Sequence, residues 1–151
     1  KEHGTTVVPT VLQSGTTTNT VPEVATLDID CRSFEMKQLQ RIDSEIRKLQ
    51  SSSAKVEVYG AINRPPLEEQ NSKQLFQILN NKLKSVGKSE VLSAAVGGAS
   101  DGNLAAAAGA QVLDGLGAVG HGAHAKTEHI LKSKIESQIE MAKLLIQELC
   151  K

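Results

Sequence analysis

Two glycine-rich stretches divide the second half of the chain into short elements. They read "GGASDGN" over residues 97–103 and "GLGAVGHGAH" over residues 115–124. Glycine interrupts helices and strands and marks turns, so no long element can run through either stretch. Around them the apolar pattern predicts, in order, a helix over 72–86, a strand over 90–96, an alanine-rich helix over 103–108, a strand over 111–114 and a long helix over 128–149. That order is typical of an α/β fold.

The first half of the chain begins with two β-rich segments. Residues 5–13 and 21–31 are rich in valine, threonine and isoleucine, and the turn-forming stretch "SGTTTNT" separates them, so we expect a β-hairpin. Alternation along the second segment puts Cys31 on the same face as Leu27 and Ile29, and Arg32 on the opposite face with Asp28 and Asp30. We therefore expect Cys31 to lie in the core and Arg32 to be exposed.

A helix, a strand and a proline loop should follow the hairpin. Apolar residues at steps of three and four predict a helix over 34–50 with Ser33 as a possible N-cap, and "KVEVYGAI" over 55–62 predicts a short strand. The loop "NRPPLE" comes next, and its two prolines disfavour a helix or a central strand. We place a domain boundary in this loop, with one domain over 1–64 and another over 65–151.

Composition excludes two classes of partner. Lysine and arginine number 17 and aspartate and glutamate number 17, so the net charge is zero, and aromatic residues make up only 2% of the chain. Without a basic field or a stacking platform, nucleic acid is not an expected partner. No apolar run is long enough for a membrane helix, and no signal segment is recognisable. We expect a cytoplasmic protein in which Cys31 and Cys150 are free thiols.

The stretch "GLGAVGHGAH" admits two chemical interpretations. Its glycines spell G-x-G-x-x-G, but seven residues intervene before the last predicted helix, and no further strand follows to carry a ribose-binding acid, so the dinucleotide interpretation fails. The alternative is a metal site at His121 and His124. These two residues supply at most two of the three or more ligands that a zinc site needs. On chemistry alone they remain either metal ligands or solvated loop histidines.

Four stretches together resemble a known family. They are "TNTVPEVATLDIDCR", "NRPPLE", "GGASDGN" and "GLGAVGHGAHAKTEHI". Their order and spacing are similar to those in the second half of the co-catalytic zinc peptidases related to aminoacylase, acetylornithine deacetylase and carboxypeptidase G, with the carboxypeptidase G branch nearest. The resemblance covers nearly the whole chain. It implies part of an α+β lid domain, which pairs two subunits, followed by the C-terminal part of an α/β zinc-peptidase catalytic domain.

The resemblance also implies roles for individual residues. His124 matches the family's zinc ligand before the closing helix, and His121 is its neighbour. Because a metal-bound histidine usually has its other nitrogen oriented by a polar partner, nearby Glu128 is a candidate for that contact. Arg32 matches the lid arginine that meets the substrate's free carboxylate. Asn19 matches the lid asparagine that reaches the active site of the partner subunit or steadies the tetrahedral intermediate.

Further substrate contacts are implied in two loops. Gly97, Gly98 and Ser100 match the loop that lines the carboxylate pocket, and glycines before a short helix should leave its N-terminal N–H groups free for an anion. Asp101 could be a pocket residue or simply the N-cap of that helix. Arg64 matches a lid-edge arginine that contacts substrate in some relatives, or it is a surface arginine of the proline loop. The acids of "EE" at 68–69 are expected in the first turn of the next helix, not in catalysis.

The family's first half has no counterpart in these residues. That half carries the remaining zinc ligands and the general-base glutamate, and His3 does not match the lid's histidine. We therefore expect a C-terminal fragment that is inactive alone and lacks its N-terminal catalytic half. The complete protein would be a zinc-dependent exopeptidase with two zinc ions, a homodimer through the lid, hydrolysing N-acyl amino acids or short peptides. A non-catalytic ligand-binding relative and a dimerisation module are the alternatives.

Overall fold

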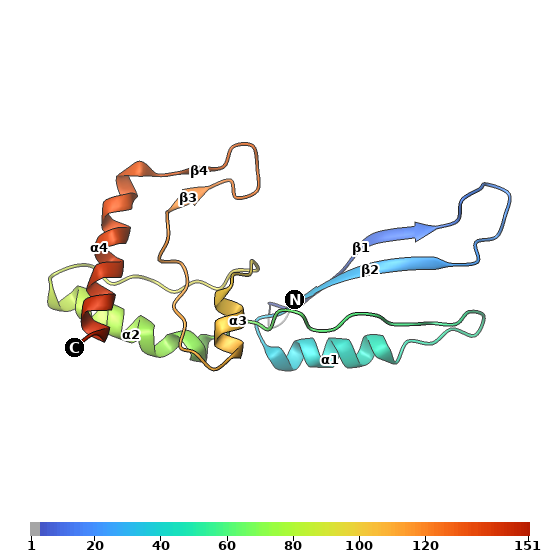
Figure 1. Cartoon of the computed structure of the whole chain (residues 1–151), viewed down its shortest axis with the longest axis horizontal. Helices are drawn as coiled ribbons and strands as arrows, with labels where there is room; N and C mark the ends of the chain where they lie inside the picture. The colour runs from blue at the N-terminus through green and yellow to red at the C-terminus, as the bar shows by residue number, and fades with distance from the viewer. Residues whose placement is uncertain (1–3) are drawn as a thin grey trace. The chain divides into compact units, whose positions relative to one another are not determined.

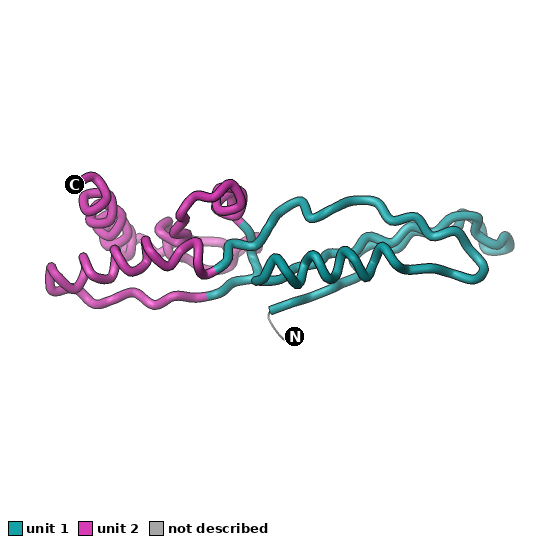
Figure 2. Tube along the Cα trace, turned by 90° about the horizontal axis from the view of Figure 1, so that it is seen from below, with its two compact units in different colours: residues 1–68, 95–99 teal, residues 69–94, 100–151 magenta. Residues whose placement is uncertain are grey.

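The computed structural model describes residues 4–151, so His3 lies outside the described residues. The chain forms two compact units, shown in different colours in Figure 2. Unit 1 contains residues 1–68 together with the short segment 95–99, and unit 2 contains residues 69–94 and 100–151. The described residues form four helices and two small antiparallel sheets, which confirms a mixed α/β class. That the units are a lid and a catalytic portion stays a prediction.

Unit 1 begins with the predicted hairpin. Strand β1 (Thr6–Ser14) pairs antiparallel with β2 (Ala25–Arg32), from Thr6 opposite Arg32 to Ser14 opposite Ala25 (Figure 1). The register shifts between Pro9 and Val11. Proline lacks the N–H that a strand ladder uses, so an irregularity beside Pro9 is expected.

The predicted inner face of β2 is only partly covered. Ile29 and Cys31 are half-buried, whereas Leu27 is 50% exposed. The expectation that Cys31 lies in the core is therefore wrong, although it is a free thiol, as is Cys150. Burial raises the pKa of the Cys31 thiol, and the Asp30 carboxylate adds to the rise. Since the thiolate is the reactive form, a raised pKa lowers the reactivity of Cys31.

Helix α1 (Met36–Arg47) follows β2, with Leu39 and Ile42 buried on one face. Its start differs from the prediction because Glu35, not Ser33, occupies the N-cap position. The Ser33 hydroxyl accepts a hydrogen bond from the Glu35 N–H at 3.2 Å, and a Glu68 carboxylate oxygen accepts one from the Met36 N–H at 2.9 Å. Glu68 thus accepts a hydrogen bond from a backbone N–H in the first turn of α1. We had expected Glu68 in the first turn of the next helix along the chain.

The segment 55–62 forms no strand, contrary to the prediction. It runs back beside α1 (Figure 1), where the Arg47 side chain donates to the Gly60 carbonyl at 2.7 Å. A strand is defined by a ladder of bonds to a neighbouring strand. Within the part of unit 1 that the structure describes, β1 and β2 pair only with each other.

Unit 2 is built on two helices. Helix α2 (Glu69–Ser85) carries Glu69 in its first turn, as expected, and packs on helix α4 (Lys132–Leu149) around the buried side chains of Leu79, Leu83 and Leu145. Gly87 ends α2 with φ 74°, where the Gly87 N–H bonds to Lys84 O and the Lys88 N–H to Leu83 O. This is the Schellman motif, and it confirms Gly87 as the predicted stop.

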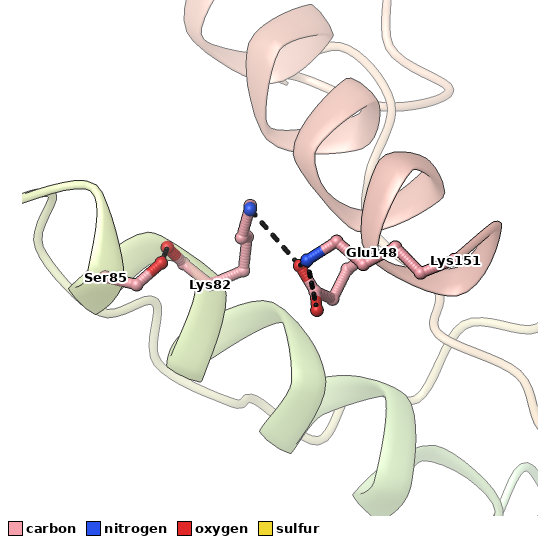
Figure 3. Close-up of polar contacts among 4 residues, drawn as sticks. All are labelled: Lys82, Ser85, Glu148 and Lys151. Carbon is pink, nitrogen blue, oxygen red and sulfur yellow. Dashed lines mark hydrogen bonds and ion pairs between the residues drawn. The ribbon is translucent and has the colours of Figure 1, made fainter.

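An ion-pair cluster joins the ends of α2 and α4. Glu148 lies between Lys82, whose ammonium is 3.2 Å from Oε2, and Lys151, at 2.7 Å from the same oxygen (Figure 3). The Lys82 and Glu148 side chains are only 20% and 31% exposed. Partial burial reduces screening by water, so this pair is better protected than a surface pair.

The strands predicted at 90–96 and 111–114 are absent from the described residues. Their backbone groups bond to α2 instead: the Asn80 amide makes two bonds to the Val91 backbone, at 2.8 and 3.1 Å, and the Val112 N–H donates to Asn71 O at 2.9 Å. Helix α3 (Gly102–Ala107) lies between these segments close to the predicted range.

A short hairpin precedes α4 and was not predicted. Strand β3 (Gly120–His121) pairs antiparallel with β4 (His129–Ile130), so α4 begins at Lys132 and not at residue 128 (Figure 1). A side chain at position 120 would collide with the His129 carbonyl, which explains the glycine there. None of the helices that the structure describes combines the length and hydropathy needed to cross a bilayer.

Candidate functional site

The Arg32 guanidinium is held from two sides within unit 1. Its Nε donates to Asp30 Oδ2 at 2.7 Å, and its Nη1 donates to the Gly97 carbonyl at 3.1 Å. The side chain is nevertheless 59% exposed. Two residues that the sequence assigned to substrate binding, Arg32 and Gly97, are thus in direct contact.

Asp30 was not recognised as a site residue from the sequence. Its carboxylate fixes the direction of the Arg32 guanidinium through the Nε bond. A signal was present, because Asp30 and Arg32 are two residues apart in a strand and therefore share a face. Alternation alone does not say that their side chains will pair, since Asp28 lies on the same face.

Asn19 and Arg64 lie away from the Arg32 contact. Asn19 is exposed in the loop 15–24, beyond the Ala25 end of the hairpin, whereas Arg32 is at the opposite end of β2. Seven residue steps of about 3.3 Å separate the two ends of β2 by roughly 23 Å. Arg64 is exposed in a bend of the proline loop. Within one chain, Asn19 and Arg32 therefore cannot contact the same small substrate.

Ser100 is engaged in the local structure of α3. Its hydroxyl donates to Asp114 Oδ2 at 2.6 Å and accepts from the Gly102 N–H at 3.1 Å, while the Asn103 side-chain oxygen accepts from the Ser100 N–H at 3.0 Å. These bonds fix the start of α3 through Ser100 and Asn103. They overturn the expectation of free N–H groups at this end, because Gly102 N–H bonds to Ser100 Oγ, Asn103 N–H to Ser100 O and Leu104 N–H to Asp101 O.

Asp101 occupies the N-cap position of α3 but makes no side-chain capping bond. Asp101 is therefore the N-cap residue by position, while the Ser100 hydroxyl makes the side-chain bond to the first turn of α3. Gly97 and Gly98 have no positive φ, and a side chain at either position would meet no atom within 4 Å. The described residues give no steric reason for two glycines there.

His124 lies at the tip of the β3–β4 hairpin. It is exposed and has φ 65°, the one positive φ outside glycine among residues 4–151. The Ala125 N–H donates to Gly122 O at 2.8 Å, which closes a turn with His124 third in the four residues. A type II turn requires positive φ at that position and normally has glycine or asparagine there.

Residues 4–151 can supply His124 to a metal but form no closed set of ligands around an ion. No group of three or more histidine, cysteine, aspartate or glutamate side chains with metal-binding geometry occurs in the described part of the chain. Glu128, the candidate to orient His124, is exposed, with its backbone N–H bonded to Ala125 O at 3.0 Å. An exposed imidazole suits zinc as one ligand, and a closed zinc site needs at least three from the protein.

His129 was overlooked in the sequence. It lies directly opposite His121 in the β3–β4 register, and the two ring centroids are 5.8 Å apart. Its Nδ1 lies 2.8 Å from the Thr127 carbonyl oxygen. The only signal was a second histidine eight residues after the first, across a glycine-containing turn. The glycines of G-x-G-x-x-G lead into strand β3.

Comparison with known proteins identifies the family. No curated protein matched the chain. The family model for peptidase family M20/M25/M40 matches residues 2–148, which is nearly the whole sequence. The match extends through both units, from the hairpin that carries Arg32 to helix α4. The chain therefore belongs to peptidase family M20/M25/M40.

Proposed function

We propose that the chain is part of a cytoplasmic, zinc-dependent amidohydrolase of the carboxypeptidase G type. Its substrates would be N-acyl amino acids or short peptides with a free carboxylate. Membership of a peptidase family supports cleavage of an amide bond. The remaining metal ligands, the general-base glutamate and the second zinc ion would come from a catalytic portion outside these residues.

The main support for this proposal is that the Arg32 guanidinium has a fixed orientation and free N–H groups. Asp30 and Gly97 take two of its N–H groups, and arginine has five, so three remain for a ligand. A planar fork with a fixed orientation and free donors suits a carboxylate. Fixing the substrate's carboxylate in this way would align the scissile amide without cost at the moment of reaction.

His124 is the proposed zinc ligand. It would bind the ion as a neutral imidazole, and its left-handed backbone supports a functional role because such conformations cluster at active sites. Bound zinc would supply a water of lowered pKa and polarise the scissile carbonyl. Gly97 and Gly98 would leave room for the substrate, since nothing lies within 4 Å of either position's missing side chain.

The lid would act as a homodimer. The hairpin places Asn19 and Arg32 at opposite ends, so Asn19 would serve the active site of the partner subunit if both residues meet substrate. Exposed apolar residues on the hairpin, such as Leu12 at 71% and Leu27 at 50%, support an interface there.

The zinc content of two variants of the complete protein tests the proposal. After dialysis against metal-free buffer, His124→Ala should have lost one zinc equivalent per chain and essentially all amidohydrolase activity. His121→Ala is the matched control, because His121 is also exposed on the same hairpin, and it should keep its zinc and change the rate only modestly. Loss of zinc from the control alone would overturn the assignment, and zinc unchanged in both would remove His124 from the metal site.

A further inference from the structure

Two imidazoles face each other across the β3–β4 hairpin. His121 and His129 are directly opposed in the antiparallel register, so their side chains project from the same face of the two strands. Both residues are exposed, and their ring planes are inclined by 52° with centroids 5.8 Å apart. Neither residue has a part in the proposed hydrolysis.

The separation of the rings fits one shared metal ion. Metal–nitrogen bonds to histidine are about 2.0–2.1 Å, which puts the ring centroid roughly 3.2 Å from the ion. When the angle between the two metal–nitrogen bonds is tetrahedral or somewhat wider, the ring centroids are roughly 5–6 Å apart. The observed 5.8 Å lies in that range, so both rings could bind one ion with no change in the strand register.

The protonation of His129 also suits a metal ligand. With a carbonyl oxygen 2.8 Å away, Nδ1 must carry the proton and donate it to Thr127 O. Nε2 then bears the lone pair in the neutral ring. Histidines that bind metals usually donate their other N–H to a backbone carbonyl or carboxylate in this way.

The hairpin backbone holds the two histidines without any ion. Gly120 allows the close approach of the His129 carbonyl, and the Leu131 N–H donates to Val119 O at 2.8 Å beyond the paired residues. The turn between the strands is closed by the bonds from Ala125 to Gly122 and from Glu128 to Ala125. A preorganised pair loses little freedom on binding an ion.

We propose that His121 and His129 form a two-imidazole site for Zn²⁺. Water would complete the coordination. His124 is not a third ligand, because these three histidines do not form a metal-binding group in the described part of the chain. With two protein ligands the site is weaker than a catalytic zinc site and releases its ion on dialysis. The bound ion would link β3 to β4 and restrict the motion of the loop 122–128 between them.

Titration of the 151-residue chain with ZnCl2 tests the pair. Isothermal titration at neutral pH without competing buffers measures the affinity, and carbon-13 spectra with ZnCl2 show which histidine rings shift. His121→Ala and His129→Ala should each weaken binding by about tenfold or more, because the second imidazole is held at high effective concentration. His124→Ala is the control from the same hairpin and should stay within about twofold of the parent. Zn²⁺ should shift the ring signals of His121 and His129 together.

Three results would overturn the site. An equal loss of metal affinity in the His124 variant would mean that the loop histidine holds the ion. Unchanged affinity in all three variants would place the ion elsewhere, for example on a cysteine. Zn²⁺ shifts confined to one ring would exclude a shared ion. Backbone spectra of each variant check that the hairpin is kept. The result is independent of the proposed zinc role of His124, which is judged by dialysed zinc content and activity of the complete protein.

Discussion

At the scale of single residues, the proposed role of Arg32 predicts that Asp30 controls how the guanidinium binds substrate. Arg32→Ala in the complete enzyme removes the guanidinium and should cost about 2 kcal/mol or more in kcat/KM on substrates with a free carboxylate. Asp30→Asn keeps the guanidinium but weakens the 2.7 Å bond to its Nε, so it should give a smaller loss that appears mainly in KM. Steady-state kinetics on matched substrates with and without the carboxylate measures both effects.

Asp28→Asn is the control for that comparison. Asp28 shares the strand face of Asp30, and the hydrogen bond that Thr10 Oγ1 donates to it at 3.2 Å goes to the backbone oxygen, which asparagine retains. Its kinetics should match the parent enzyme. Equal losses for the Asp28 and Asp30 variants, or a loss in Arg32→Ala that persists on a carboxylate-free amide, would contradict the role of Arg32.

Sequence patterns predicted on which face a single residue lies better than which other residue it contacts. Alternation in β2 correctly put Arg32 on the exposed face, because the two-residue repeat of a strand is a local property. The pairing of Arg32 with Asp30, and of Glu68 with the start of α1, depends on side-chain directions and on segments far apart in sequence. Neither could be derived from spacing.

At the scale of elements, Glu148 should make the α2–α4 contact sensitive to acid. Hydrogen bonds from Lys151 and then Lys82 hold the pKa of Glu148 below the ordinary value of 4.5. A carboxyl whose pKa is lowered by folding stabilises the fold above its unfolded pKa, and the contribution is lost as pH falls through the folded pKa. Glu148→Gln should therefore lower the melting temperature at pH 7, and the difference from the parent should shrink below about pH 4.5.

Glu140→Gln gives the matched comparison on the same helix. Glu140 pairs with Lys88 at 2.8 Å, but their side chains are 53% and 43% exposed, more than those of Glu148 and Lys82. Exposed pairs contribute little because water and salt screen them. Thermal melts of both variants from pH 7 to pH 3 should show the larger effect for Glu148, and a difference that does not depend on pH would exclude the ionised carboxylate as its cause.

The elements that the sequence predicted well are those stabilised by their own residues. Helices α1, α2 and α4 follow the apolar repeat, and Gly87 ends α2 as expected. The segments 55–62 and 111–114 have strand-like composition, but a strand also needs a partner, which a local pattern cannot supply. The β3–β4 hairpin was missed because strands of two residues leave no alternation to detect.

At the scale of the whole molecule, the two units should differ in local stability. Unit 2 has the buried cluster of Leu79, Leu83 and Leu145, whereas the hairpin of unit 1 leaves Leu12 and Leu27 largely exposed. Backbone amides open most easily where few apolar contacts must be broken. Hydrogen exchange should therefore be slowest in the middle of α2 and α4 and faster in β1 and β2.

A single substitution can establish that this protection comes from the helix pair. Leu79→Ala should speed exchange throughout α2 and α4, since truncating a buried leucine costs about 2–5 kcal/mol. Leu149→Ala, at a side chain that is 51% exposed at the end of α4, should have little effect. Uniform protection of both units in the parent chain, followed by uniform loss in the Leu79 variant, would show one cooperative fold instead of two.

The candidate site could be predicted only in part, because a motif does not say which of its residues meet in the folded chain. The resemblance marked Arg32 and Gly97, which prove to be in contact, and Asn19, which lies at the far end of the hairpin. A motif preserves the order of residues along the chain. Whether two of them meet is decided by β-strand length and by how the chain folds back, as residues 95–99 do in joining unit 1.

The φ of 65° at His124 bears on how this position could change in evolution. A left-handed residue with a side chain costs about 1–2 kcal/mol, which glycine avoids and asparagine partly offsets. Selection for folding alone would therefore favour glycine or asparagine at position 124, whereas under the proposed zinc role selection for the imidazole would keep histidine despite that cost. The proposed role therefore predicts that a lineage in which this position no longer bound zinc would replace the histidine early.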